Sequence, residues 1–285
     1  MLILAAAILS AAAAASLEVR PSEAKPGDAI LLVLAGAEVE PAATVEGRAV
    51  RFWRAGDGWR AIAGIPVEAA TGPLAISGQA GPERLSGTVT IVDPAFPAKV
   101  LTLPPRYIEP PASVRERMAA DQRAFNEAFA RPFAPPRFGG PFDWPLVAEK
   151  TGGYGDRRTY NGKQQGQHYG LDLDAAVGTP ILAANDGLVV MARDNYQAGL
   201  TVLIWHGADL YSAYFHLSRA AVKSGQVVAR GDRIGFAGAS GRATGPHLHW
   251  GIKVAGRWVD PESILRLGDL CGGACLPAPP AAPRP

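Results

Sequence analysis

Four of the chain's five histidines lie in three short motifs whose residue types could bind a metal ion. The motifs are His168-Tyr-Gly-Leu-Asp172, Tyr214-Phe-His216-Leu and His247-Leu-His249. Side chains alternate between the two faces of a strand, so His247 and His249 share one face, as do His168 and Asp172. Three ligands can therefore converge from two strands. Two neutral imidazoles and one carboxylate, with a fourth position left to water, form a catalytic rather than a structural zinc site.

The segment from His168 to Asp174 is predicted to be a strand and not a helix. A spacing of four residues also brings side chains together on a helix, as it does in H-E-x-x-H sites. Here Gly170 interrupts the motif, and the segment continues into Gly178-Thr-Pro180, which would break a helix. The apolar residues on both sides of Asp172 give a period of two, which indicates a strand with its ligands on one face.

Other titratable residues near these motifs have competing interpretations. His206 is followed by turn residues and an aromatic strand, which favours a structural role at a hairpin. Asp174 would share the face of Asp172 and could support a ligand histidine, or it could be a solvated carboxylate. Arg157 and Arg158 could attract a substrate carboxylate, although a paired role at the surface is the simpler interpretation. A single histidine is most often structural, so the joint pattern carries the metal prediction.

The order of these motifs resembles the lysostaphin-like zinc metallopeptidases, which cleave the peptides of peptidoglycan. The similar stretch covers roughly residues 140 to 268, about half of the chain. Besides the histidine motifs it includes Gly153-Tyr-Gly-Asp156, Gly178-Thr-Pro180, Asn185-Asp-Gly187, Gly231-Asp-Arg-Ile-Gly235, Gly241-Arg-Ala-Thr-Gly-Pro246 and Asp260-Pro261. The resemblance implies an antiparallel β-sheet peptidase domain with a central zinc groove.

The resemblance also implies a role for each of the matching residues. It assigns one zinc ion per chain to His168, Asp172 and His249, and it makes His216 and His247 the catalytic pair. None of these positions is substituted, which indicates an active member of the family. Some relatives use a tyrosine upstream of the first ligand to stabilise the tetrahedral intermediate, and Tyr160 is the candidate for that role here.

The chemistry of such a site explains why these residue types are needed. Zinc lowers the pKa of a bound water to about 7 and polarises the carbonyl that is attacked. Proton transfer then needs groups that titrate near the working pH, and imidazole, with an unperturbed pKa of about 6.5, is such a group. His216 and His247 fit these roles, and the sequence leaves open which of them is the base.

Composition sets the frame around the site. The chain has 285 residues, enough for about two domains, and its 33 glycines and 25 prolines indicate a turn-rich, mostly β protein. A net charge of +2 is too small to suggest nucleic acid as a partner. Peptidoglycan peptides are the expected partner on the strength of the site.

The ends of the chain predict an exported protein. Residues 1–15 are apolar and alanine-rich, as in a cleaved signal peptide, and this stretch is too short for a lasting membrane anchor. Export predicts a periplasmic or secreted protein associated with the cell envelope. In an oxidising compartment Cys271 and Cys275, the only cysteines, are expected to form a small disulfide. They lie in a terminal segment, 269–285, whose proline-rich end is expected to be extended.

Residues 16–95 are predicted to form an immunoglobulin-like β-sandwich. Turn signals such as Pro26-Gly-Asp28 separate short apolar segments at spacings near ten residues, which is typical of such sandwiches. The predicted strands are Leu17–Arg20, Ala29–Leu34, Ala49–Trp53, Trp59–Ala63, Leu74–Ser77 and Leu85–Val92. No cluster of titratable residues occurs there, so a packing or spacer domain is the favoured interpretation.

Residues 96–137 are predicted to be a proline-rich linker followed by a helix, ahead of a peptidase domain at 138–268. Ser113 and Glu116 have the spacing of a capping box, and apolar residues recur at helical spacing up to Phe129, so a helix is expected over 113–131. We expect its apolar face to pack on one of the domains. An alternative is that helix and linker lie across the groove and restrict access.

The sequence therefore predicts a zinc metalloendopeptidase that hydrolyses the cross-links or stem peptides of peptidoglycan. One alternative is a catalytically silent cell-wall-binding protein or an activator of other wall hydrolases, although the intact ligand set argues against it. A second is a zinc peptidase whose substrate is a protein. The bond that is cleaved and the oligomeric state stay open.

Overall fold

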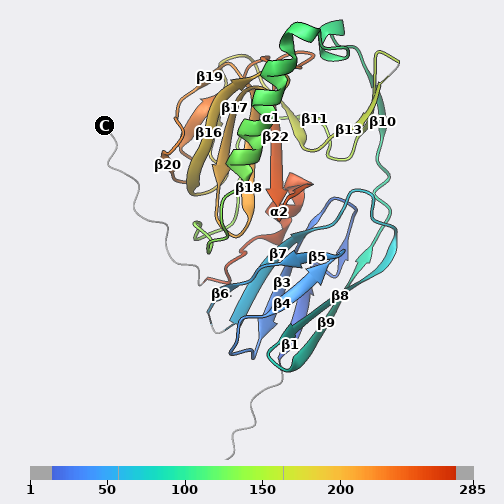
Figure 1. Ribbon diagram of the computed structural model, residues 1–285, viewed down its shortest axis with the longest axis vertical. Helices are drawn as coiled ribbons and strands as arrows, with labels where there is room; N and C mark the ends of the chain where they lie inside the picture. Colours follow the sequence, from blue (N-terminus) through green and yellow to red (C-terminus); the bar gives the residue numbers. More distant parts are fainter. Residues whose placement is uncertain (1–14, 57, 163, 274–285) are drawn as a thin grey trace, which may run out of the picture.

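The computed structural model describes residues 15–56, 58–162 and 164–273, and it shows a mostly β protein in which two β-rich parts lie end to end (Figure 1). The predicted signal peptide and Cys275 lie outside the described residues. No helix within these described ranges has the length and apolar character needed to cross a membrane. The mostly β fold expected from the sequence is confirmed.

The N-terminal part is a sandwich of two sheets. One sheet has the order β1 (Ser16–Arg20), β3 (Ala29–Ala35), β7 (Gly58–Gly64) and β6 (Trp53–Ala55). The other has the order β2 (Glu23–Ala24), β9 (Glu83–Ile91), β8 (Gly72–Ala80), β4 (Ala42–Val45) and β5 (Arg48–Val50). A shared apolar core lies between them, because Ile30 and Leu32 of one sheet pack with Ile76 and Val89 of the other.

Two details of the sandwich differ from the sequence prediction. The segment predicted as one strand over 49–53 is divided, because the chain leaves one sheet after β5 and enters the other at β6. Two short strands, β2 and β4, were not predicted. Both are too short to show a clear alternation of apolar and polar residues.

The C-terminal part is built on one antiparallel sheet. Its strands follow the order β11 (Lys150–Gly152), β14 (Leu171–Asp174), β22 (His247–Val254), β18 (Leu210–Leu217), β17 (Gly199–Trp205), β16 (Gly187–Asn195) and β20 (Val227–Val228), with β23 (Arg257–Val259) paired to β22. A small sheet contains β15 (Pro180–Leu182), β21 (Arg233–Phe236) and β19 (Arg219–Ala220). A second contains β10 (Ala98–Leu101), β12 (Arg157–Tyr160) and β13 (Gln164–Gln167).

Alternation along the central strands separates a structural face from a functional face. Leu171, Leu248 and Trp250 point into the main apolar core. Asp172 follows Leu171, and His249 lies between Leu248 and Trp250, so both point to the opposite face of the sheet. The alternation expected for His247 and His249 is therefore present in β22.

The helix α1 (Arg115–Phe129) packs on the functional face of the central sheet, across β16, β17 and β18 (Figure 1). Its Phe125, Ala128 and Phe129 contact Met191, Leu203 and Phe215 in a separate apolar cluster. The helix begins two residues later than predicted, after the short 3-10 helices η1 (Pro105–Tyr107) and η2 (Ala112–Val114). Ser113 makes no capping hydrogen bond, because it lies within η2 and Val114 occupies the cap.

The two parts of the chain share one interface rather than a flexible junction. The main core contains Leu31 and Ile62 of the sandwich together with Val259 and Ile264 near the end of the chain. Ser263, in the C-terminal helix α2 (Pro261–Leu267), accepts a hydrogen bond of 2.8 Å from the backbone of Ala29. The predicted linker also joins the C-terminal part, because β10 pairs in parallel with β12.

Candidate active site

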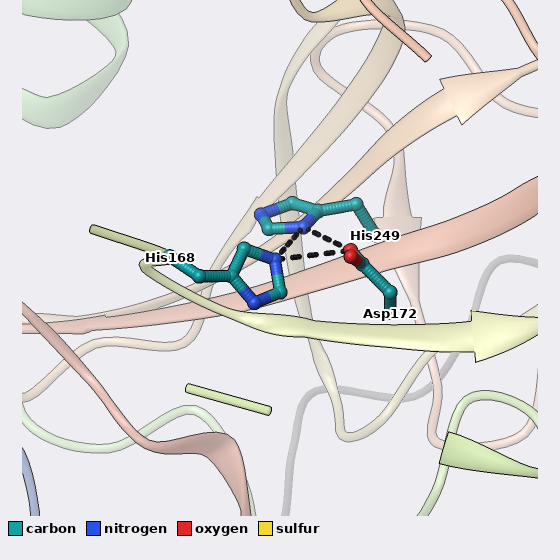
Figure 2. A group of neighbouring side chains, drawn as sticks. All are labelled: His168, Asp172 and His249. Atoms are coloured by element: carbon teal, nitrogen blue, oxygen red, sulfur yellow. Dashed lines mark hydrogen bonds and ion pairs between the residues drawn. The ribbon is translucent and has the colours of Figure 1, made fainter. Parts of the chain in front are cut away.

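Three ligand atoms from His168, Asp172 and His249 converge on one point (Figure 2). The Nε2 atom of His168 lies 3.0 Å from Oδ1 of Asp172 and 2.9 Å from Nδ1 of His249. The same His249 nitrogen lies 2.7 Å from Oδ1 of Asp172. Asp172 and His249 are direct partners in the register of β14 and β22, which explains how two strands bring them together.

His168 reaches this point from a connecting segment. It follows the end of β13, and β14 begins only at Leu171, so the predicted strand over 168–174 is wrong for its first three residues. A Cβ atom on Gly170 would lie 2.7 Å from Cε1 and Nε2 of His249. The chain therefore passes beside the His249 ring where only glycine leaves enough space.

The ligand set suits a zinc ion. Nδ1 of His168 lies 2.6 Å from the carbonyl oxygen of Gly153, which can only accept, so Nδ1 carries the proton and Nε2 presents its lone pair to the site. Two nitrogens and one carboxylate oxygen thus meet as electron-pair donors, and a bound cation satisfies all three. Two imidazoles and a carboxylate are ligands that zinc takes in catalytic sites.

The protonation states of these residues also favour metal binding. Burial on its own would raise the pKa of Asp172, but the adjacent imidazole rings of His168 and His249 hold it well below its usual range. Burial lowers the pKa of His249 to about 4, against the opposing effect of its hydrogen bond to Asp172. Asp172 is therefore ionised and His249 neutral at neutral pH, the forms in which both bind metal.

Arg158 orients the ligand carboxylate. Its Nη2 atom donates to Oδ2 of Asp172 at 2.6 Å, which leaves Oδ1 directed at the two histidines. Arg158 is therefore paired, as the simpler interpretation expected, but its side chain is only 11% exposed, so the pair is buried and does not lie at the surface. Asp174, the other candidate for a supporting role, is exposed, and within the described ranges it makes no hydrogen bond to a ligand histidine.

Replacing Arg158 with methionine is expected to weaken zinc binding by roughly 10–100-fold, the usual effect of losing a partner of a ligand. The apolar side chain keeps the packing but frees Oδ2 of Asp172 inside the site. The matched control is Arg157→Met, because Arg157 is exposed and precedes Arg158 directly. Competition with a chromogenic chelator measures both affinities, and equal affinities would contradict the orienting role.

His216 and His247 face each other next to the ligands. Their ring centroids are 4.9 Å apart, and Nε2 of His247 lies 3.7 Å from Oδ1 of Asp172. Nδ1 of His216 donates to the carbonyl of Ser240 at 2.8 Å, and Nδ1 of His247 donates to that of Gly245 at 2.9 Å. These bonds leave Nε2 of each ring as the proton-accepting nitrogen. Burial is the main cause that lowers the pKa of His216 to about 3, and repulsion from His249 and His247 adds to it. The His216 ring is therefore neutral at neutral pH.

The backbone at His216 is strained. Its φ of 60° lies in the left-handed region, which a residue with a side chain rarely adopts. The pairing of β17 with β18 shifts between Leu200 and Val202, opposite this residue, so an irregularity in the ladder accompanies the unusual φ. Strain of this kind costs about 1–3 kcal/mol and is concentrated at functional sites.

His206 has the structural role expected from the sequence. It is fully buried, with Nδ1 2.6 Å from the carbonyl oxygen of Asp186 and Nε2 2.8 Å from the hydroxyl of Ser212. Burial lowers the pKa of His206 to about 4. The ring is neutral at pH 7 and forms part of a buried polar chain that continues to Tyr214.

The buried His206 predicts a loss of stability in acid. The unfolded chain binds a proton at this residue below about pH 6.5 and the folded chain only below about pH 4, so the free energy of unfolding falls as the pH drops through this window. The full effect is about 3 kcal/mol. Urea unfolding of the metal-free protein at pH 7 and pH 4 should therefore show a smaller acid loss for His206→Gln than for the wild type. An identical loss in both would exclude this contribution.

The five residues assigned by resemblance open into one groove of about 620 Å³. Tyr160, at the end of β12, also lines it, and the guanidinium of Arg242 lies 5.3 Å from the Tyr160 ring centroid. Gln167, at the end of β13, and the turn residue Gln197 form further parts of the wall. The expected central groove is therefore present, and the three metal-binding candidates, His216, His247 and Tyr160 all lie along it. Cys271 is not part of its lining, and Cys275 lies outside the described residues.

Two walls of the groove come from the segment predicted as linker and helix. Gln122, Phe125, Asn126 and Phe129 of α1 line one part, and Lys99 and Leu101 of β10 line another. The expectation that the apolar face of the helix packs on one of the domains is confirmed. The alternative, that helix and linker restrict access to the groove, stays a prediction. Sequence reasoning missed these individual residues because their positions depend on contacts between distant segments.

Comparisons with known proteins agree with this geometry. Residues 166–261 match the model of Peptidase family M23. Over 98 residues the chain is 47% identical to the Peptidoglycan DD-endopeptidase ShyA of Vibrio cholerae, which covers 34% of this chain and 23% of that protein. The DD-carboxypeptidase/endopeptidase Mpg of Neisseria meningitidis is 38% identical over 97 residues, or 34% of this chain and 22% of that protein.

A solved structure extends the similarity beyond the matched segment. A peptidase M23 from Pseudomonas aeruginosa has 28% identity and a TM-score of 0.63, over 84% of this chain and 94% of that one. The aligned region thus includes much of the fold outside residues 166–261, whereas the chain spans less than a quarter of the length of both curated relatives.

These findings confirm the family that the sequence motifs indicate. The segment that carries the three metal-binding candidates, together with His216 and His247, is a Peptidase family M23 domain, of the lysostaphin-like type.

Proposed function

We propose that this protein is an exported zinc metalloendopeptidase that hydrolyses peptide bonds in the cross-links or stem peptides of peptidoglycan. The observation that carries the proposal is the convergence of His168, Asp172 and His249 beside His216 and His247 in one groove of an M23 domain. Relatives named as peptidoglycan endopeptidases support the substrate class.

The proposed division of labour follows from the positions of the nitrogens. His168, Asp172 and His249 would hold a zinc ion, which would supply a Lewis acid to polarise the carbonyl and make water more acidic. His216 and His247 each keep Nδ1 protonated through a backbone carbonyl, so Nε2 can take a proton from the attacking water and return it to the leaving amine. Tyr160, buried along the same groove, is the proposed donor to the oxygen that becomes negatively charged.

Export and the disulfide belong to the same proposal. A cleaved signal peptide at residues 1–15 would deliver the enzyme to the periplasm or beyond, where its substrate lies. Cys271 is buried, with Sγ 3.5 Å from the carbonyl oxygen of Phe138, so a bond to Cys275 would fix the end of the chain against the core. Mass spectrometry of the intact protein before and after reduction and alkylation would detect this bond.

Digestion of purified peptidoglycan tests the function. Zinc-loaded protein should release peptides whose masses show hydrolysis of a peptide bond, with the glycan strands left intact, and chelation should stop the release. Stoichiometric zinc binding without any released product from several wall types would contradict the proposal and favour a silent wall-binding protein.

A further inference from the structure

Lys253 lies in the same groove as the metal ligands. It belongs to β22, and since alternate residues of a strand share a face, His247, His249 and Lys253 all line the groove. Lys253 lies four positions after His249, which corresponds to about 13 Å along a strand. An extended peptide crosses this distance in about four residues.

The ammonium group of Lys253 has aromatic rings as its close neighbours. Nζ lies 4.0 Å from the ring centroid of Phe129 and 5.4 Å from that of Trp258. Within residues 15–56, 58–162 and 164–273, Lys253 takes part in no ion pair, whereas the partly exposed Lys99 and the exposed Lys150 both do. A partly buried cation is stabilised most by an anion, so this end of the groove favours a negatively charged group.

A continuous aromatic wall connects Lys253 with the metal-binding site. The ring of Phe215 lies 5.2 Å from that of His249 and 6.2 Å from that of Trp258. Trp258 in turn lies 5.8 Å from Phe129, edge to face. A peptide that runs along this wall from the metal-binding site would place its apolar groups on the rings and reach Lys253 at the far end.

We propose that Lys253 binds a carboxylate of the substrate peptide and thereby selects acidic peptides over their amidated forms. This specificity role rests on the proposed function, because the metal-binding site fixes where the scissile bond lies. Phe129 comes from α1, outside the segment that matches the M23 model, so the helix contributes directly to the carboxylate site. An ammonium beside aromatic rings can form a charge-assisted hydrogen bond to a carboxylate that a neutral amide forms only weakly.

The test compares two synthetic stem-type peptides that are identical except that every carboxylate of one is converted to a carboxamide. Calorimetry with the zinc-loaded full chain should show at least roughly tenfold tighter binding of the carboxylate peptide. Lys253→Met should bind both peptides equally, and Lys253→Arg should keep most of the preference. The matched control is Lys223→Met, which removes an exposed lysine outside the groove and should behave as the wild type.

The outcomes separate the two proposals. A preference that persists in Lys253→Met would place the carboxylate elsewhere, for example on the metal, and would overturn the assignment. Equal binding of both peptides by the wild type, or binding of neither, would overturn it as well. Hydrolysis is measured on the same samples, so a lysine-dependent preference without cleavage would contradict the proposed enzyme while supporting the carboxylate site.

Discussion

Substituting His249 with alanine is expected to empty the metal site and to reduce peptide hydrolysis to background. The substitution removes one of the two proposed nitrogen ligands, and it leaves Asp172 with His168 and Arg158 as its closest partners. Zinc affinity should therefore fall by more than the roughly 10–100-fold that accompanies loss of a supporting residue. Metal analysis after dialysis against a defined free zinc concentration measures the loss.

A control keeps the loss of metal distinct from a loss of fold. His249 lies on the groove side of β22, whereas Leu248 and Trp250 on both sides of it carry the core packing. Circular dichroism of metal-free His249→Ala should therefore match that of metal-free wild type. A folded variant that retained one zinc per chain would show that His249 is not a ligand.

Substituting His216 with asparagine is expected to leave zinc in place and to lower the rate of hydrolysis by about 10²–10⁴-fold, the usual effect of losing a general acid or base. Asparagine is chosen because it tolerates the left-handed backbone that His216 adopts with φ of 60°. Within the described residues, His216 makes no hydrogen bond or ion pair with His168, Asp172 or His249, and its ring centroid lies 6.0 Å from that of His249. Metal content and the initial rate of amine release are the two measurements.

The contrast between the two variants separates ligands from proton-transfer residues. If His216→Asn lost zinc to the same extent as His249→Ala, the proposed division between these residues would be wrong. If it kept both zinc and full activity, proton transfer would have to use another group. His247 would be the remaining candidate, because the carbonyl oxygen of Gly245 holds its Nδ1 and leaves Nε2 free to accept a proton.

The sequence was sufficient to predict which side chains of a strand share a face, but not which side chains of neighbouring strands lie opposite each other. Alternation placed His247 and His249 on one side of a strand, and the structure agrees. Only the register of β14 with β22 shows that Asp172 faces His249, whereas His247 faces Asp174. Register depends on pairing between segments far apart in the chain, so spacing alone left the third ligand open and the family resemblance was needed to select it.

The supporting residues were harder to predict for a related reason. Arg158 and Lys253 are ordinary charged residues in sequence, and their roles arise from burial beside Asp172 and beside Phe129. For Lys253 a signal was present, because it continues the alternation of His247 and His249 along the same strand. For α1 the helix itself could be predicted, but its placement along the groove required contacts with β18 that no local pattern specifies.

Release of new amino groups from purified peptidoglycan tests the central claim most directly. Zinc-loaded wild-type protein should release amino groups at a rate proportional to enzyme concentration, and zinc-loaded His216→Asn, compared at equal metal content, should release almost none. Equal release by both proteins, or none by the wild type with one zinc bound per chain, would contradict the account of this site as a zinc peptidase that uses His216 for proton transfer.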